Sequence, residues 1–392
     1  MKRIHVMKRI HVKSVGPISE ADVTLGDLTV LVGPQATGKS VFLQVLKLIV
    51  DFPAIQTELR RFNIDWQGDP QSFFELYFGD GMGTLWGAGS ELSVDGEARS
   101  LPDFTKSPRN RPKDEHLFFI PAQRVMSLRD GLTRPFTDYR AGDPFALREF
   151  SEKLHGLVQN EFGRDPALFP KANRLNASLR EPLIDHVFGG FGLNVDAEKH
   201  QKRIVLSPPA GGTSLPYLVW SAGQREFVPL LLGLYWLLPP GKVSRRGKLE
   251  WVVIEELEMG LHPRAISATL ALVLELLSRG YRVCLSTHSP HVLDVVWGLQ
   301  FLKANGGKPR EVLDILGIKP SAGAHQLAKA ALDKTFKVHS FRRGAPVEDI
   351  SGLDPTSESK EEAGWGGLTE FSGRVGDVVA KVARRADTER AS

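Results

Sequence analysis

The sequence contains a single cysteine, Cys284, among its 392 residues. One thiol cannot form an intrachain disulfide, so a disulfide framework is excluded, and this low use of cysteine favours the reducing cytoplasm. Long hydrophobic runs are also missing, because the longest, residues 227–238, falls short of the roughly 20 residues that span a bilayer. The N-terminus lacks the apolar segment of a signal peptide. We therefore predict a cytoplasmic protein with no membrane span.

Neither sign of charge dominates, because the sequence contains 50 Lys and Arg residues and 46 Asp and Glu residues, which gives a net charge of +4. This balance permits nucleic-acid binding, but any basic surface would have to come from local clustering. Sustained heptads are absent from residues 130–190, which argues against a long coiled coil. Residues 1–6 and 7–12 repeat the hexapeptide MKRIHV, and we interpret Met7 as the effective start.

A phosphate-binding loop is predicted at residues 33–40, GPQATGKS, which fit the pattern G-x-x-x-x-G-K-[ST]. Residues 28–32 before the loop are aliphatic and predict a buried strand. Apolar residues at helical spacing after the loop predict a helix. Strand, glycine loop and helix form the context that this motif requires, and a chance glycine-rich turn is the alternative.

Each residue type in the loop has a chemical reason to be there. Gly33 and Gly38 allow a tight turn whose N–H groups, with the helix N-terminus, bind phosphate. Lys39 can reach the β- and γ-phosphate oxygens, and the Ser40 hydroxyl can bind Mg²⁺. The predicted nucleotide-binding residues here are Gly33, Pro34, Gln35, Ala36, Thr37, Gly38, Lys39, Ser40 and Val41.

Hydrolysis also needs a carboxylate for the metal and a group that orients water. Glu255 and Glu256 follow a predicted buried strand at 251–254, so we expect Glu255 at the Mg²⁺ and Glu256 at the attacking water. His288 follows another apolar strand and could donate a hydrogen bond to the γ-phosphate. Gln123 follows the predicted strand 117–120 and could contact Mg²⁺ or the water. The alternatives are an acidic turn, a structural histidine and a plain loop glutamine.

The order of motifs resembles the ABC-type ATPases of the SMC and OLD (overcoming-lysogenization-defect) group, especially compact prokaryotic AAA family ATPases often found in anti-phage defence systems. The glycine loop is similar to Walker A, residues 221–224 (SAGQ) to the ABC signature, and residues 251–256 to Walker B. Residues 261–263 and 286–291 are similar to the D-loop region and the switch-histidine segment. These motifs occur in the expected order across residues 28–294.

The chain departs from the family pattern at three positions. Ala222 replaces a glycine of the signature, Glu255 replaces the more usual aspartate, and Leu257 stands where proline is common. The longer side chain of Glu255 puts the metal geometry in question. The long coiled coil of SMC proteins is missing, and residues 300–392 contain no convincing equivalent of the acidic toprim cluster of OLD nucleases.

The resemblance implies a dimer in which two heads enclose two ATP molecules with Mg²⁺. Ser221, Gly223 and Gln224 at the signature helix of one head would contact the γ-phosphate that Lys39 of the other head holds. Hydrolysis would then loosen the dimer. The expected partners are a second copy or a higher homo-oligomer and a separate effector protein, with nucleic acid as a further candidate.

The predicted fold class is α/β: a P-loop NTPase of the ABC-ATPase head type, with a mixed sheet, a helical insertion and a small C-terminal extension. Residues 1–130 are expected to form an ATPase lobe, with irregular structure and a hairpin near 92–97 within 51–116. Residues 131–200 would form the helical insertion, and 201–300 the part with the signature, Walker B and His288. Residues 301–392 would be the extension, with a linker at 344–365 and a short, frayed tail helix.

Three functions compete at this stage. The first is an ATP-driven dimeric switch or sensor in anti-phage defence or DNA maintenance. The second is an OLD-like enzyme with a cryptic nuclease site in residues 130–200 or 300–392. The third is the ATPase subunit of a transporter, which the segments around His262 and residues 287–290 disfavour.

Overall fold

A six-stranded sheet lies at the centre of the protein, in the strand order β15-β14-β3-β13-β12-β6. Neighbouring strands run parallel except for the pair β14 and β15. The computed structural model describes residues 7–106, 114–162, 166–171, 173–196, 201–240 and 244–391, so the first copy of the repeated hexapeptide lies outside it. The strands are β3 (Leu28–Val32), β6 (Leu117–Ile120), β12 (Trp251–Ile254), β13 (Arg282–Ser286), β14 (Phe336–Ser340) and β15 (Glu348–Asp349).

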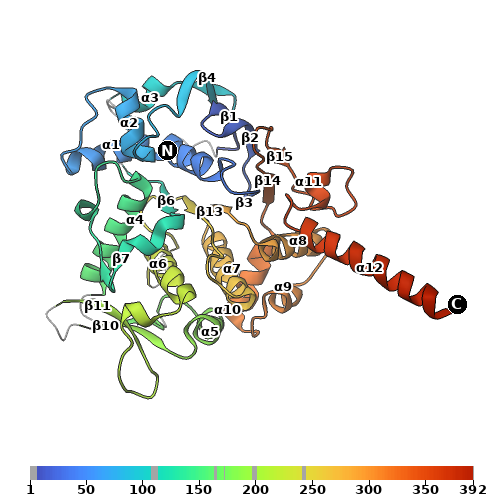
Figure 1. The fold of residues 1–392 in the computed structure, drawn as a ribbon. Helices are drawn as coiled ribbons and strands as arrows, with labels where there is room; N and C mark the ends of the chain where they lie inside the picture. Colours follow the sequence, from blue (N-terminus) through green and yellow to red (C-terminus); the bar gives the residue numbers. More distant parts are fainter. Residues whose placement is uncertain are drawn as a thin grey trace.

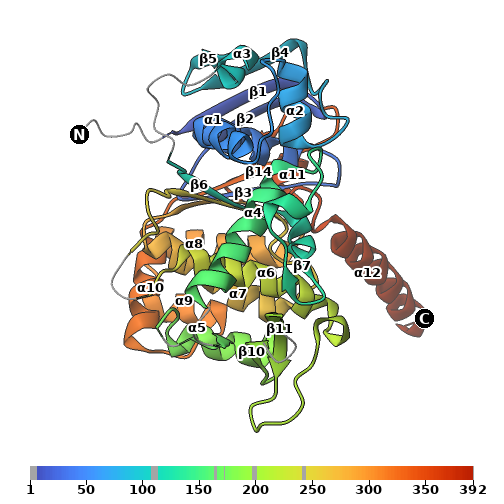
Figure 2. The same cartoon turned by 90° about the vertical axis from the view of Figure 1, so that its left-hand side faces the viewer.

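The sheet is buried on both faces, which explains why its strands are continuous apolar runs. Side chains alternate between two cores: Val30 and Val32 of β3 face one, and Leu31 faces the other. Helix α1 (Lys39–Arg61) lies on the Leu31 side, between this sheet and a second, antiparallel sheet (Figure 2). A layer of helices covers the opposite face (Figure 1).

The antiparallel sheet has the order β2-β1-β4-β5. Its strands are β1 (Arg9–Val15), β2 (Ile18–Thr24), β4 (Trp86–Val94) and β5 (Glu97–Arg99), so the predicted hairpin near 92–97 is confirmed. The irregular structure predicted for 51–116 is wrong in part, because α1 continues to Arg61 and α2 (Pro70–Phe78) and α3 (Leu101–Thr105) follow. In α2 the aromatic residues bury one helical face, as their spacing allows.

The helical layer contains helices that follow the signature, Walker B and histidine motifs. The helix expected at the signature is α6 (Ala222–Leu237), and α7 (Pro263–Ser278) follows the segment that is similar to Walker B. The layer also contains α4 (Phe145–Gly156), α8 (Pro290–Ala304), α9 (Pro309–Leu316) and α10 (Ala322–Leu332). Short 3₁₀ segments are η1 (Ala122–Ser127), η2 (Phe136–Asp138) and η5 (Tyr217–Val219), and β7 (Leu128–Arg129) and β8 (Leu132–Thr133) form a small hairpin.

The predicted helical insertion is only partly helical. After α4 come η3 (Leu157–Glu161), α5 (Ala177–Leu183) and η4 (Ile184–Phe188), but β9 (Ala167–Phe169) and β10 (Gly192–Asp196) pair with β11 (Arg203–Ser207) in a three-stranded sheet. These strands are short, and their partners are distant in sequence, so a local pattern gives little signal for them.

The C-terminal region is more integrated than the sequence suggested. β14 joins the main sheet beside β3, and the linker predicted at 344–365 is wrong, because Ile350 and Leu353 are fully buried and Trp365 nearly so. After α11 (Lys360–Ala363), the tail forms α12 (Glu370–Ala391), a helix of 22 residues that projects from the body (Figure 1). Its exposed apolar side chains are Phe371, Val375, Val378, Val379 and Val382. The predicted domain boundaries stay a prediction.

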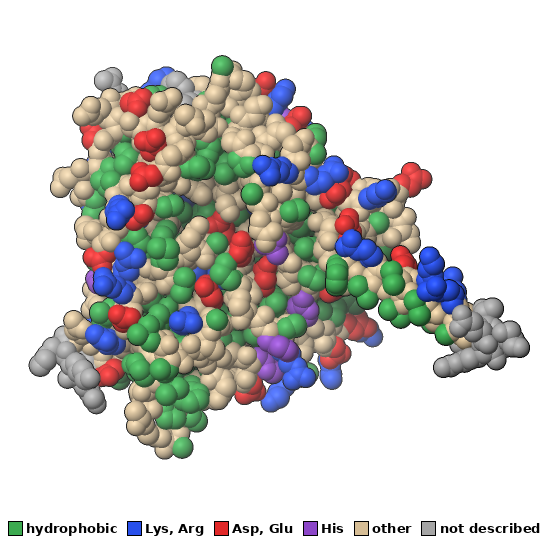
Figure 3. All heavy atoms as spheres, viewed as in Figure 1, with side chains coloured by type: hydrophobic (Ala, Val, Ile, Leu, Met, Phe, Trp, Pro, Cys, Tyr) green, Lys and Arg blue, Asp and Glu red, His purple; other side chains and the backbone are tan. Residues whose placement is uncertain are grey.

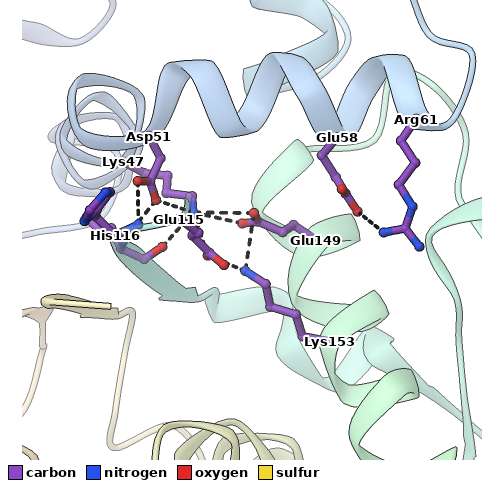
Figure 4. Close-up of polar contacts among 9 residues, drawn as sticks. Lys47, Asp51, Glu58, Arg61, Glu115, His116, Glu149 and Lys153 are labelled. Carbon is purple, nitrogen blue, oxygen red and sulfur yellow. Dashed lines mark hydrogen bonds and ion pairs between the residues drawn. The ribbon is translucent and has the colours of Figure 1, made fainter. Parts of the chain in front are cut away.

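A buried cluster of charges fixes α1 against β6 and α4 (Figure 4). The Lys47 ammonium is fully buried and lies 2.9 Å from Asp51, 2.9 Å from Glu115 and 3.2 Å from Glu149. Lys153 pairs with Glu115 and Glu149. By length and composition α1 could cross a membrane, but 67% of its most apolar window is buried within the protein, as in a core helix.

Candidate functional site: a phosphate loop at the carboxyl edge of the sheet

The predicted site residues follow four neighbouring parallel strands. Gln123 follows β6, and Glu255 and Glu256 follow β12. His288 follows β13, and Gly33 follows β3. Because parallel strands end at one edge of the sheet, segments that are far apart in sequence meet there. This edge is the usual ligand site of an open α/β sheet.

The backbone of the phosphate loop requires glycine at two positions. Gly33 has φ 128°, and a Cβ atom on it would lie 2.1 Å from the carbonyl oxygen of Phe341. Gly38 has φ 99° and packs against Ile18, whose side chain a Cβ would meet at 2.5 Å. Such contacts are too short for any side chain, so the two glycines set the shape of the loop. Pro34, Gln35, Ala36 and Ser40 are exposed, whereas Thr37 and Val41 are buried.

Lys39 lies in the mouth of this loop. Its ammonium donates hydrogen bonds to the carbonyl oxygens of Gly33 and Pro34, at 2.7 and 2.6 Å. Burial lowers the pKa of Lys39 to about 8, although the carboxylates of Glu256, Glu258 and Glu255 oppose the shift. A cation with three nearby carboxylates and reduced hydration is therefore held where phosphate oxygens would bind.

Glu255 provides the carboxylate that the magnesium prediction needs. Its side chain is 2% exposed, and one oxygen accepts a hydrogen bond from the Ala122 amide at 3.0 Å. Burial raises the pKa of Glu255, and the neighbouring Ser40 hydroxyl and Ala122 amide oppose this shift. Its Oε1 atom is buried and unpartnered among the described residues. A free carboxylate oxygen beside the Ser40 hydroxyl fits a hard cation such as Mg²⁺.

Glu256 adopts an unusual backbone conformation beside the histidine. Its φ is 45°, in the left-handed region, and its amide donates to the Ser286 carbonyl at 3.0 Å. Its carboxylate Oε1 lies 3.9 Å from His288 Nε2, and its side chain is about one-third exposed. Glu256 and His288 thus face each other next to Lys39 and can share contact with a molecule in the loop.

A third carboxylate, Glu258, was missed by the sequence reasoning. It accepts a hydrogen bond from the backbone amide of His288, and its Oε2 atom is buried without a partner among the described residues. Burial and the Lys39 charge lower the pKa of His288, against the opposing effect of Glu256 and Glu258. The imidazole is therefore neutral near pH 7 and has one N–H to donate.

Gln123 is exposed in η1, next to Ala122, whose amide binds Glu255. This places Gln123 at the edge of the site. Its neighbour Arg124 is fully buried and donates hydrogen bonds to the carbonyl oxygens of both Glu255 and Glu256. One signal in the sequence could have found Arg124, its place four residues after the end of a predicted strand.

The signature residues form the start of α6. Ser221 and Gln224 make a capping box, in which the Ser221 amide donates to Gln224 and the Gln224 amide donates to the Ser221 hydroxyl. Gly223 packs against Gly260, whose carbonyl oxygen would lie 2.5 Å from a Cβ at position 223. Gln224 also donates to Val187 of η4 at 3.4 Å. Ser221 itself is exposed, so the N-terminus of α6 is open to a ligand.

Acidic and histidine side chains gather near the centre of one face, in front of α7 (Figure 3). The three glutamates, His288 and Lys39 form one electrostatic group, since the charge of each carboxylate acts on Lys39. The structure therefore brings Walker A, Walker B and the histidine together within one chain, while the Ser221 hydroxyl makes its hydrogen bond within its own helix start.

A comparison with protein families finds one match, over residues 28–294, to the family described as "AAA domain, putative AbiEii toxin, Type IV TA system". The matched range covers well over half of the chain and contains every motif named above. The chain belongs to this AAA-domain family. The resemblance predicted from the motifs and the α/β P-loop fold class are both confirmed. A search of curated proteins finds no match.

Among solved structures, the AAA-domain chain is similar to the SMC head domain from Thermotoga maritima, at 12% identity and TM-score 0.33, over 88% of this chain and 98% of that one. An SMC head bound to the C-winged helix domain of ScpA gives 10% identity and TM-score 0.40, over 88% and 97%. A dimeric post-hydrolysis state of the ATP-binding cassette MJ0796, bound to ADP and Pi, gives 12% and 0.31, over 72% and 89%. At these scores, the likenesses say nothing about what this chain binds.

Proposed function

We propose that this protein is an ATPase whose two copies close around ATP and separate after hydrolysis. The observation that supports the proposal best is the arrangement of Lys39, Ser40, Glu255, Glu256 and His288 around one phosphate loop. A binding loop, a metal carboxylate, a second carboxylate and a neutral histidine are the groups that hydrolysis of a phosphoanhydride requires.

Each residue has a separate task in this proposal. Lys39 and the loop amides bind the β- and γ-phosphates, and Ser40 with Glu255 holds Mg²⁺, for which Gln123 is a further ligand candidate. The bound cation neutralises charge on the phosphate oxygens. Glu256 orients the attacking water, and His288 donates a hydrogen bond to the γ-phosphate.

The position of the signature supports a dimer. Ser221 is exposed, and its hydroxyl serves its own helix as a cap. The N-terminus of α6 is a ready site for an anion. We propose that it meets the γ-phosphate in the loop of a second copy, together with Gly223 and Gln224, so that ATP joins the two subunits.

The test compares two variants. Lys39→Ala should lose ATP binding, because the loop then lacks its cation. Glu256→Gln should bind ATP with unchanged affinity, lose turnover by at least about 10²-fold and accumulate as a dimer, since the hydrogen-bonding geometry is kept but the charge is lost. Binding is followed with a fluorescent ATP analogue, turnover by phosphate release, and size by light scattering after gel filtration, with and without ATP.

Glu97→Gln is the matched control, because Glu97 lies on β5 with a side chain that is 77% exposed. It should behave as the unsubstituted protein in all three measurements. Normal turnover in Glu256→Gln would refute the role of that carboxylate. A Glu256→Gln protein that stays monomeric at saturating ATP would refute the proposed ATP-dependent dimer.

We further propose a cytoplasmic location and a role in anti-phage defence or DNA maintenance through a separate effector. The support is the motif resemblance and the toxin–antitoxin wording of the family description. Nucleic-acid binding stays a prediction that a gel shift with a steep salt dependence would support. Within the described residues, no cluster of three or more His, Cys, Asp and Glu side chains suited to a metal occurs.

A further inference from the structure

Arg124 is a buried arginine whose hydrogen bonds all end on backbone carbonyl oxygens. It donates to Glu255 at 2.8 Å, to Glu256 at 2.9 Å, to Glu226 at 3.2 Å and to Pro121 at 3.4 Å. The side chain is 0% exposed. A buried guanidinium is expensive to dehydrate, so it persists where its planar fork satisfies several acceptors at once. Here the fork joins η1, the end of β12 and the first turns of α6.

The bond to Glu256 bears on the strained backbone of that residue. A non-glycine residue in the left-handed region costs about 1–3 kcal/mol and persists where its surroundings hold it. The Glu256 amide is held by the Ser286 carbonyl at 3.0 Å, and the Glu256 carbonyl is held by Arg124. Both peptide groups of Glu256 are therefore fixed, and its carboxylate is directed toward His288.

The bond to Glu226 connects the same guanidinium to the signature helix. Glu226 lies five residues after Ser221 in the chain, on the first turns of α6. A small displacement of this end of α6 would move a carbonyl oxygen that Arg124 holds. Arg124 would then have to adjust its fork at the carbonyl oxygens of Glu255 and Glu256 as well, since one rigid plane carries all these donors.

We propose that Arg124 is a positioning residue that holds Glu256 in its reactive conformation and couples it to the signature helix of the same chain. A displacement of the start of α6 would thereby be transmitted through Arg124 to the carboxylate that orients water. The inference rests on the proposed function, because it assigns a role to Glu256 and to the signature. Arg124 itself touches neither ATP nor water in this scheme.

The first experiment separates positioning from binding. Arg124→Lys keeps the charge but replaces the planar fork with a single ammonium, which cannot reach all four carbonyls in the same geometry. We expect ATP affinity within about threefold of the unsubstituted protein and a fall in kcat of at least about 10²-fold. The variant should still form the ATP-dependent dimer. Arg124→Gln, whose amide can serve one carbonyl, is the second variant if the lysine form does not fold.

Arg148→Lys is the matched control for burial. Arg148 is 1% exposed, donates to the Ala141 carbonyl at 2.8 Å and stacks on Phe136, on the α4 side of the protein. Thermal midpoints are measured for both lysine variants. If kcat falls in both variants in proportion to the loss of thermal stability, Arg124 is merely structural and the proposal is overturned. A normal kcat in folded Arg124→Lys overturns it as well.

Mixed dimers test whether Arg124 acts on the Glu256 of its own chain. A Lys39→Ala subunit supplies an intact signature but no working loop. Mixed with Ser221→Arg subunits, it should restore activity, because the Ser221→Arg chain supplies the loop and Glu256. Mixed with Arg124→Lys subunits, it should restore none, because the only working loop is then beside a misplaced Glu256. Restored activity in the second mixture overturns the proposal.

The same mixtures distinguish a failure of the proposed function from a failure of this inference. If Lys39→Ala with Ser221→Arg restores nothing, the shared ATP site is wrong. The comparison of affinity and kcat in Arg124→Lys alone then still decides whether Arg124 positions Glu256. That measurement needs no partner subunit.

Discussion

Substituting Lys47 with methionine should destabilise the fold by about 3 kcal/mol, at the low end of the cost of breaking a buried ion pair. Methionine keeps the volume of the side chain but removes the charge. The Lys47 ammonium contacts three carboxylates and donates to the Leu117 carbonyl at 2.6 Å. Without it, Lys153 is the lysine that remains beside Asp51, Glu115 and Glu149 (Figure 4).

The expected loss of stability is at the low end of this range because the three acids keep other hydrogen-bond and ion-pair partners. Asp51 still accepts hydrogen bonds from the amides of His116 and Leu117, at 2.8 and 2.9 Å. Glu115 and Glu149 still pair with Lys153. Burial already raises the pKa of Glu149 in the intact cluster, so this carboxyl is the first to take up a proton when Lys47 is lost.

The penalty should therefore depend on pH. In the variant, the folded-state pKa of Glu149 lies above the unfolded value, so the folded state binds more protons as the pH falls. The destabilisation is full well above that folded-state value and shrinks as the pH falls toward about 4. Urea unfolding at several pH values, followed by tryptophan fluorescence, measures the free energy of unfolding.

Lys319→Met is the matched control. Lys319 is 84% exposed and pairs with Glu181 at 3.3 Å, so its loss should cost less than about 1 kcal/mol. If Lys47→Met also costs less than about 1 kcal/mol, the cluster does not stabilise the packing of α1 on β6 and α4. A cost that grows as the pH falls would refute the assignment of the effect to unpaired carboxylates.

Two further predictions concern the phosphate loop and its neighbour. Because burial lowers the pKa of Lys39 to about 8, this ammonium loses its proton as the pH rises through about 8, and the affinity of the nucleotide-free protein for an ATP analogue should fall between about pH 7 and about pH 9. A flat affinity over that range would contradict the buried lysine. His288→Asn should keep ATP affinity and lower kcat by about 10²-fold, because only a hydrogen bond to the reacting phosphate is lost. An unchanged kcat in a phosphate-release assay would remove His288 from the reaction.

Much of the fold could be predicted from the local sequence, because the structure of several segments depends on residues that are close together in the chain. The loop at 33–40, the capping box at Ser221 and the apolar runs of β3, β6, β12 and β13 depend on spacing and residue type alone. Local patterns did not predict the strands β9 and β10 or the burial of the residues after 344. Their pairing and burial depend on partners far away in the chain, such as Phe169 with Leu193.

The residue types of the site were determined by the sequence itself: a glycine loop with its lysine and serine, two glutamates after a strand, and a histidine after the next. Their meeting was decided by the tertiary structure, because only the parallel order β6, β12, β13 and β3 brings those strand ends to one edge. The surroundings of Arg124 and Lys47 were likewise decided by the tertiary structure. A buried cation is stabilised by acceptors from separate segments, and no spacing along the chain specifies which carbonyls or carboxylates will surround it.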